Sequence, residues 1–320
     1  MTWVPILLAE RSASLRYLVL RDLLEVPKND AELMELERLR THDRILTELL
    51  DLQDDDGSFR TMDGSRDSWR GIWSTSQALL RLGYLGFDSN CPAVKQAAEF
   101  LFSQQEQDGS WALPDEKSER EIREPYSMIP LQTGMPLRAL AASGYAQDPR
   151  SENAYEWLIA NRLPDGAWPS GVKSGQHVFP GGYRRLAHSR FGCRTNTTFA
   201  VSALANHPIR KHSQPGRKGL DHLLAQEVLQ SHALGFEVAR TIGFERGGGY
   251  FTYFARQDPA MLLDLCGKIG ASLEDSRVSD LVNFILGLQG PYGLWENPSK
   301  PIASRWISFD LLRSLSFIDE

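Results

Sequence analysis

One short pattern recurs along this chain and constrains its fold more than any other feature. Glutamine is followed by three residues, a glycine, one residue and an aromatic residue at 105–111, and the same pattern stands at 53–59 and 289–295. A fourth copy at 162–168 has Arg162 in the glutamine place, and 248–250 is a candidate degenerate copy. Each copy lies between apolar runs with helical spacing. The sequence therefore predicts repeated pairs of helices.

The residues of the pattern suit the end of a helix. Glycine accepts the left-handed backbone that a helix C-terminus commonly needs. The glutamine amide can bond to backbone groups left open there. The aromatic ring can pack over the turn and connect one helical pair to the next. Because one pair cannot bury its apolar face alone, the pairs must stack or close on one another.

Apolar spacing and helix-ending residues predict about eleven to twelve helices and almost no sheet. We expect the first helix of each pair outside, the second inside, and an irregular segment at 231–256. Because the repeats span nearly the whole chain, residues 1–320 are predicted to form a single domain. The expected helices span 15–24, 31–52, 73–85, 93–104, 131–142, 151–161, 196–205, 218–230, 259–269, 276–288 and 308–317.

The repeated pattern resembles the signature repeat of the terpenoid cyclases, which the β subunits of protein prenyltransferases share in a looser form. The resemblance covers roughly the whole chain. It implies an all-α (α/α)6-like toroid, in which an inner ring of helices lines a cavity and an outer ring surrounds it. It also implies an apolar, isoprenoid-like substrate. The motif belongs to the scaffold, so it does not by itself specify an activity.

The second helices of the pairs can be aligned with one another. Setting Leu82, Leu140 and Leu204 in register places a threonine at one shared position near each helix start. Small polar residues there are expected first of all to be N-caps, and in a toroid they also face one end of the cavity. The shared position holds Thr75, Thr133, Thr197 and, in the last pair, Ser308; the position before it holds Ser74, Gln132, Asn196 and Asp258.

Class II terpenoid cyclases carry Asp-x-Asp-Asp-Thr in this register, and the middle aspartate protonates an alkene or epoxide. Here the corresponding stretch runs from Cys193 to Thr197 and reads Cys-Arg-Thr-Asn-Thr. The first repeat has Gly-Ile-Trp-Ser-Thr at 71–75. Neither stretch offers an acid, so this chain departs from the family's pattern and the catalytic role is not transferred.

Asp258 is the one carboxylate at an aligned helix start, and Asp310 is the second candidate acid. The simpler interpretation makes Asp258 an N-cap, with Pro259 at the favoured first helical position. The functional interpretation makes it the acid of the cavity, because a carboxyl held against aromatic rings has a raised pKa and can donate a proton. Both interpretations remain open at the level of sequence.

Candidate substrate-binding residues stand at the starts of the second helices and in the loops before them. Aromatic rings in a cyclase cavity stabilise carbocations by cation–π attraction. Packing in the core is the alternative for each of them. The candidates are Trp69, Trp73, Phe191, Cys193, Asn196, Tyr250, Tyr253, Phe254 and Trp306.

No metal or cofactor is predicted. The run Asp54 to Asp56 could attract magnesium or diphosphate, but it lies in a scaffold turn, where aspartate and glycine are common. A zinc site drawing on His188, Cys193 and two further histidines, His207 and His212, lacks the tight spacing of known zinc sites.

Charge and cysteine content limit which partners and which cellular compartment the sequence allows. The net charge is −6 with no basic block, which argues against nucleic acid as a partner. Three cysteines are too few and too scattered for a disulfide framework. With no signal peptide and no apolar run of about 18 residues, a cytoplasmic protein is predicted, and peripheral membrane contact is left open.

These features predict an enzyme of the class II terpene cyclase type, an isomerase or lyase. It would cyclise an isoprenoid-type substrate by protonation in an aromatic-lined cavity, without the usual acidic motif. The alternatives are a toroid that binds an apolar ligand or a protein without catalysis, and a glycosidase-like toroid. A glycosidase needs two opposed carboxylates about 5–10 Å apart. Candidates for such a pair are Asp258, Asp264, Glu237, Glu245 and Asp310.

Overall fold

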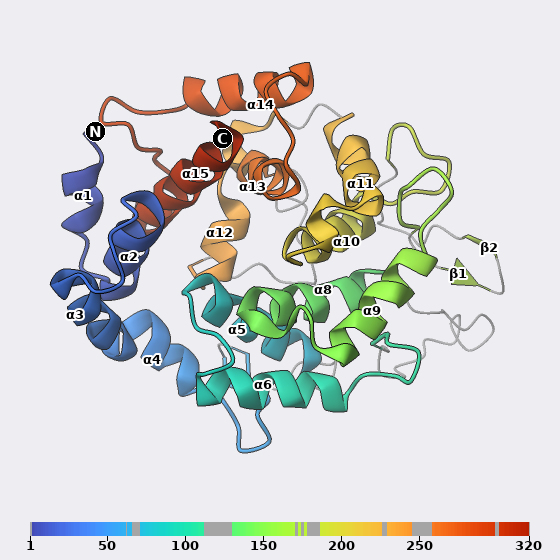
Figure 1. Ribbon diagram of the computed structural model, residues 1–320, viewed down its shortest axis with the longest axis horizontal. Helices are drawn as coiled ribbons and strands as arrows, with labels where there is room; N and C mark the ends of the chain where they lie inside the picture. The colour runs from blue at the N-terminus through green and yellow to red at the C-terminus, as the bar shows by residue number, and fades with distance from the viewer. Residues whose placement is uncertain are drawn as a thin grey trace. The chain divides into compact units, whose positions relative to one another are not determined.

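The computed structural model describes residues 2–61, 63–65, 71–111, 130–169, 172–173, 176–177, 186–225, 229–244, 258–297 and 301–319. These residues are mostly helical (Figure 1). Their strands are β1 (Val172–Lys173) and β2 (Gln176–His177), which pair antiparallel with Val172 opposite His177. The all-α prediction is confirmed. The chain forms two compact units, Leu52–Glu227 and Met1–Asp51 with Val228–Glu320. The single domain stays a prediction.

The unit Leu52–Glu227 contains two complete helix pairs, preceded by the second helix of one pair and followed by the first helix of another. Its second-of-pair helices form a row in which α8 contacts both α5 and α10, and α6, α9 and α11 each pack against one of them. All twelve residues of α10 are buried, whereas the first-of-pair helices keep an exposed face. Within this unit the second helices are therefore the inner ones. The helices are α5 (Ile72–Tyr84), α6 (Pro92–Ser103), α8 (Pro130–Leu140), α9 (Pro149–Ala160), α10 (Arg194–Ala205) and α11 (Gln214–Leu224), with η3 (Ala141–Tyr145) and η4 (Arg210–His212).

The other unit joins the two ends of the chain. Helix α15 packs against α13 and also contacts α12 and η1, while α14 packs on α13. The helices are α1 (Val4–Leu8), α2 (Ala13–Leu18), α3 (Ala31–Leu39), α4 (Arg44–Leu50), α12 (Phe236–Thr241), α13 (Pro259–Ile269), α14 (Ser276–Gly287) and α15 (Ser304–Asp319). Shorter helical segments are η1 (Val19–Leu23), η2 (Arg40–His42), η5 (Ser231–Ala233) and η7 (Pro301–Ala303).

The glutamine of the repeated pattern joins its own turn to the next outer helix. Nε2 of Gln105 donates to the carbonyl of Gly109 at 2.9 Å and to the carbonyl of Arg150, in the first turn of α9, at 3.0 Å. Gln53 makes the equivalent two bonds in the first copy. Gly109 has a φ of 92°, the left-handed backbone that the pattern predicts. The glutamine amide therefore bonds carbonyls of its own turn and of the next outer helix, and not the groups left open at the helix end that the sequence predicted.

Where the aromatic residue of the pattern is tryptophan, it is bonded through both its indole N–H and its backbone N–H. The indole of Trp111 donates to the carbonyl of Leu101 at 2.8 Å, and its backbone N–H donates to Oγ1 of Thr133 at 3.3 Å. The aligned hydroxyls are therefore acceptors for the preceding turn. The N-cap interpretation of the threonine position is wrong, because Thr133 lies one turn inside α8. The same backbone bond joins Phe59 to Thr75, Trp168 to Thr197, and Trp295 to Ser308, at 2.9, 3.0 and 2.8 Å.

Two sequence-based expectations about helices are wrong. The expected helix at 31–52 is divided into α3, η2 and α4, because Asp43 takes an extended backbone and caps α4. Its Oδ2 also accepts from the hydroxyl of Ser12 at 2.6 Å and from the N–H of Ser14 at 2.8 Å. The segment expected to be irregular contains α12, which begins after Gly235 with a φ of 74°.

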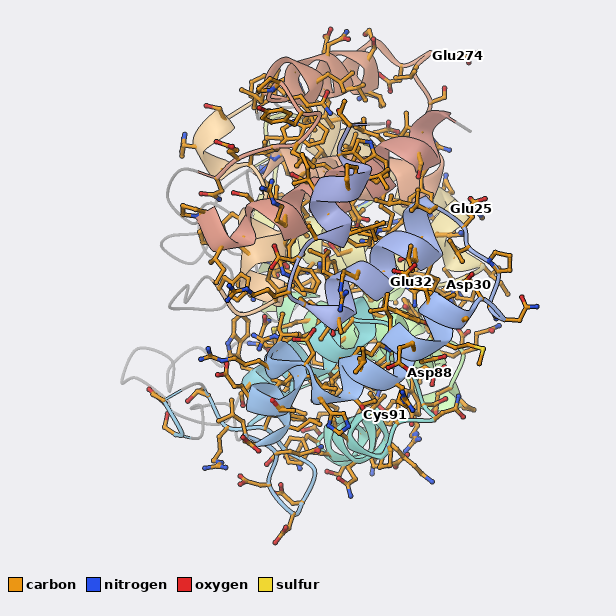
Figure 2. The ribbon with its side chains drawn as sticks, turned by 90° about the vertical axis from the view of Figure 1, so that its left-hand side faces the viewer. Glu25, Asp30, Glu32, Asp88, Cys91 and Glu274 are labelled. Carbon is orange, nitrogen blue, oxygen red and sulfur yellow. The ribbon has the colours of Figure 1, made fainter. Side chains whose placement is uncertain are left out.

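Polar caps define several helix starts as expected. Asp30 caps α3 by accepting from the N–H groups of Glu32 and Leu33 (Figure 2). Cys91 stands directly before α6 (Figure 2), and the three cysteines form no disulfide. Among the residues that the structure describes, we find no helix with the length and hydrophobicity to cross a membrane.

Candidate functional site

Asp258 joins the starts of two helices in the unit that contains both chain ends. Its Oδ1 accepts from the N–H groups of Ala260 and Gly235 at 2.9 and 2.8 Å, and its Oδ2 accepts from the N–H of Glu237 at 2.8 Å. The first bond caps α13, and the other two hold the start of α12 against it. Because the side chain is only 2% exposed, this carboxyl is an interior group.

Burial has the largest effect on the acidity of Asp258. It raises the pKa of the carboxyl to about 7, with a smaller contribution in the same direction from the charge of Glu237. The three N–H donors favour the ionised form and oppose this rise. Near neutral pH the carboxyl can therefore exist in both forms, as a proton donor or acceptor must.

The other candidate carboxylates of this unit are neutralised within their own helices. Glu237 is 3% exposed and forms a two-bond ion pair with Arg240, at 2.7 and 2.8 Å. A nearby cation favours the ionised form of a carboxylate, so such a group is a poor proton donor. Asp258 has no cationic partner among the described residues. The further pairs are Asp264 with Lys268 at 2.8 Å and Asp310 with Arg313 at 2.6 Å.

Of the remaining site residues predicted in this unit, the structure describes only some. Trp306 lies on α15 and is 3% exposed. Asp310 lies one turn further along the same helix and is 4% exposed. Four other named residues, Tyr250, Tyr253, Phe254 and Glu245, lie outside the described residues.

In the unit Leu52–Glu227, the candidates gather at the start of α10. Cys193 is fully buried at the N-cap position, and its thiol makes no capping bond. Asn196 is also fully buried, and its Oδ1 accepts from the N–H of Leu131 on α8 at 2.7 Å. This bond crosses from one inner helix to the next and fixes the orientation of the amide.

Gln132 shares the aligned register of Asn196 but is not among the predicted substrate-binding residues. It is 3% exposed, and its Oε1 has no hydrogen-bond partner among the described residues. The Nδ2 of Asn196 is unsatisfied in the same way. Buried polar atoms are normally bonded, so each exception calls for a physical reason. The signal available in the sequence was the shared register of these two residues.

Two aromatic candidates of this unit are half-buried. Trp73 lies in the first turn of α5, and Phe191 lies two residues before Cys193 with the guanidinium of Arg190 at 4.9 Å from its ring centroid. Trp69 lies outside the described residues.

The possible metal ligands are dispersed or already engaged. His188 is exposed, whereas His207 is buried and its Nε2 is 2.9 Å from Oε1 of Glu152. In the first scaffold turn, Asp54 pairs with Arg60 at 3.2 Å and Asp56 accepts from Ser58. Over the described part of the chain, no three His, Cys, Asp or Glu side chains are grouped to hold a metal ion.

Sequence comparison finds the same family that the repeats indicate. The model of the squalene-hopene cyclase C-terminal domain matches residues 31–188. The squalene–hopene cyclase of Bradyrhizobium diazoefficiens is 29% identical over 133 residues, which are 39% of this chain and 19% of that protein. The chain therefore matches only about a fifth of the length of this relative.

Comparison with solved structures extends the likeness to most of the fold. The type II terpene cyclase MstE from Scytonema, bound to geranylgeranyl dihydroxybenzoate, has a TM-score of 0.50 and 16% identity, over 85% of this chain and 70% of its own. A protein from Actinoplanes has a TM-score of 0.50 and 15% identity, over 100% of this chain and 90% of its own. At such identities the likeness concerns the fold alone, and it confirms the predicted α/α toroid class. With its repeats, the family model matched over residues 31–188 and this fold, the chain is similar to the terpenoid cyclase superfamily.

Proposed function

We propose that this protein binds an isoprenoid-type substrate and starts its cyclisation by protonation, with Asp258 as the proton donor. The observation that carries the proposal is a buried carboxyl, without a cationic partner among the described residues, whose pKa is raised to about 7. Such a carboxyl retains its proton close to neutral pH and can deliver it to an apolar substrate. Asp310 ranks second, because its ion pair with Arg313 favours the ionised form.

The proposed step conserves atoms and charge. The O–H bond of Asp258 breaks, and the proton forms a C–H bond with one carbon of a substrate alkene. The neighbouring carbon becomes a cation, which the next alkene of the chain attacks to close a ring. A C–H bond next to the cationic carbon of the cyclic product then breaks, its electrons form an alkene, and the proton passes to the carboxylate of Asp258, which restores the acid. Aromatic rings such as that of Trp306, buried in the same unit, would stabilise the cation.

The choice of substrate class draws on the superfamily. MstE binds a geranylgeranyl chain attached to a dihydroxybenzoate, and the matched domain belongs to an enzyme named for squalene. A chain of isoprene units supplies both the alkene that accepts the proton and the alkenes that close rings. We also propose a cytoplasmic location, which suits three cysteines that form no disulfide.

The test compares Asp258→Asn with a matched control. Asn cannot serve as the acid, so turnover of C10 to C30 isoprenoid alcohols and diphosphates is expected to be lost in this variant. Its stability will also fall, because the amide nitrogen would face the N–H of Glu237 in place of Oδ2. Asp43→Asn is the control, because Asp43 likewise caps a helix and accepts from a second segment. It should lose comparable stability and keep its turnover.

The outcome is scored on the folded fraction, measured by circular dichroism. Loss of turnover in folded Asp258→Asn, together with retained turnover in Asp43→Asn, supports the proposal. Full turnover in folded Asp258→Asn excludes Asp258 as the acid and moves the search to Asp310.

The second candidate is a toroid that binds an apolar ligand without catalysis. It is favoured by the three N–H bonds on Asp258, which suit a purely structural cap, and by the absence of an acid from Cys193 to Thr197. Mass spectrometry of an organic extract of the purified protein would identify a bound lipid. A retained lipid that is recovered unchanged after incubation would favour this candidate over the cyclase.

A further inference from the structure

We infer that the starts of α8 and α10 form a subsite for a hydroxyl group on the ligand, so that the substrate is an oxygenated isoprenoid and not a plain hydrocarbon. The inference rests on the proposed function for the isoprenoid part of the ligand. The juxtaposition that carries it is a buried donor on Asn196 and a buried acceptor on Gln132, neither of which has a hydrogen-bond partner among the described residues.

The orientation of Asn196 follows from its one hydrogen bond. Oδ1 accepts from the N–H of Leu131 at 2.7 Å, and an N–H group can be matched only by an oxygen. Nδ2 therefore occupies the other arm of the amide, and its two N–H groups are available for donation. The residue is 0% exposed, so bulk water cannot satisfy these donors.

The acceptor on Gln132 belongs to the residue next to the one that bonds Asn196. Gln132 directly follows Leu131, the residue bonded to Asn196. The two helices approach closely because α8 carries Gly134 here: an added Cβ would lie 3.2 Å from the carbonyl carbon of Phe199 on α10. A donor and an acceptor, both buried and both unsatisfied, thus belong to one contact between two inner helices.

The neighbouring polar side chains of α10 are satisfied, which makes this pair specific. Oγ1 of Thr198 donates to the carbonyl of Arg194 at 2.8 Å. The hydroxyl of Ser202 donates to the carbonyl of Thr198 at 2.6 Å, and Oγ1 of Thr197 accepts from Trp168. Leaving two polar groups buried and unpaired disfavours folding, so their retention suggests that a ligand supplies the missing bonds.

The missing partner must accept one hydrogen bond and donate another. A hydroxyl group does both with a single oxygen. An alkene or alkane does neither. A diphosphate offers mainly acceptors and a charge, so it would meet the Gln132 oxygen unfavourably. The chemistry therefore selects an alcohol or phenol, although a buried water molecule could make the same two bonds.

The test measures the affinity of the full chain for a C15 isoprenoid alcohol, the hydrocarbon of the same length and the diphosphate of the same chain. The wild type should bind the alcohol about tenfold more tightly than the hydrocarbon, the effect of two net hydrogen bonds. Gln132→Met keeps the length of the side chain but removes the acceptor, and it should reduce this preference to about threefold or less. Asn196→Asp keeps the oxygen that accepts from Leu131 but replaces the donating NH2 group by a second oxygen. It should reduce the preference for the alcohol by the same amount.

Thr198→Val is the matched control, since it removes a buried hydroxyl that is already satisfied within α10. It should leave the preference for the alcohol unchanged. The inference is overturned if the wild type binds alcohol and hydrocarbon equally, or if both variants keep the full preference for the alcohol. In either case water alone fills the subsite, and the apolar ligand of the proposed function is unaffected. Binding of none of the three compounds would overturn both. If Asn196→Asp fails to fold, the preference of Gln132→Met for the alcohol over the hydrocarbon decides whether the inference holds.

Discussion

Replacing Trp168 by alanine should lower the free energy of unfolding by about 3–5 kcal/mol, the usual cost for a large buried aromatic side chain. Trp168 is 0% exposed, and its indole N–H donates to the carbonyl of Leu158 at 2.7 Å. The ring packs so closely on α11 that a Cβ added at Gly219 would lie 2.9 Å from it. The variant therefore loses the buried ring and also leaves a buried carbonyl without its donor.

Urea unfolding followed by far-ultraviolet circular dichroism measures this loss, with linear extrapolation to water. Trp168→Phe keeps most of the ring but not the donor, and it should cost about 1–3 kcal/mol. The matched control is Trp157→Ala on α9. Trp157 is half-buried, and its indole donates to an aspartate at the surface, so about 1 kcal/mol or less is expected.

The comparison between the two tryptophans decides the argument about the scaffold. If Trp168→Ala costs no more than Trp157→Ala, the ring of the repeated pattern does not hold the helical pairs together. Trp111→Ala repeats the test in the preceding pair, where the ring is 1% exposed and its indole bond has almost the same length. A large cost at Trp168 with none at Trp111 would restrict the scaffold function to a single repeat.

Three further predictions use the same denaturation assay. Thr197→Val should cost about 1–3 kcal/mol by leaving the N–H of Trp168 unsatisfied, and Thr197→Ser should restore most of it; equal effects would refute the bond. Gly109→Ala should lower the free energy of unfolding, because φ is 92° and the added Cβ would lie 2.7 Å from the backbone of α9. Gly287→Ala, in an open helical position, should raise the free energy of unfolding by about 0.5–1 kcal/mol. If the Gly109 variant were the more stable of the two, the geometry would be contradicted. The pKa of Asp258 is about 7 in the folded protein and about 3.9 in the unfolded chain. Its contribution to stability is therefore fully present below about pH 4 and is lost as the pH rises towards 7, by up to about 4 kcal/mol. The stability of the wild type relative to Asp258→Asn should therefore fall over that range, and a constant difference would contradict it.

Local signals predicted the helix pairs well, because the repeated pattern is a local structure. Its glutamine-to-glycine and indole bonds lie within ten residues, and α13 has the bounds that the sequence predicted. The division of the expected helix at 31–52 was missed for a non-local reason. Asp43 takes its extended backbone while bonding to Ser12 and Ser14, which lie about thirty residues earlier. Tertiary contacts override helix propensity at that point.

In the candidate sites, too, contacts between neighbours in the sequence were predicted and contacts between distant segments were not. The pair Asp258 and Pro259 indicated a helix start, and Asp258 does cap α13. Its bonds to Gly235 and Glu237 depend on α12, which the sequence did not reveal. Because of these bonds Asn cannot replace Asp258 without cost, since an amide offers only one acceptor oxygen for three donors.

The shared register of the inner helices separates scaffold from chemistry. The hydroxyl position has one task, to accept the N–H of the aromatic residue, and it remains threonine or serine in four pairs. The position before it has no such fixed partner and is free to vary. Its hydroxyl in the first pair, on Ser74, donates to the carbonyl of Phe59, and in the last pair the position is the apolar Ile307. Only α8 and α10 place unsatisfied amide atoms there, and those helices are neighbours. Among the described residues, this register holds a neutral polar pair in one unit and a buried carboxyl in the other, so the polar group of the ligand and the protonation of Asp258 are the two properties to measure first.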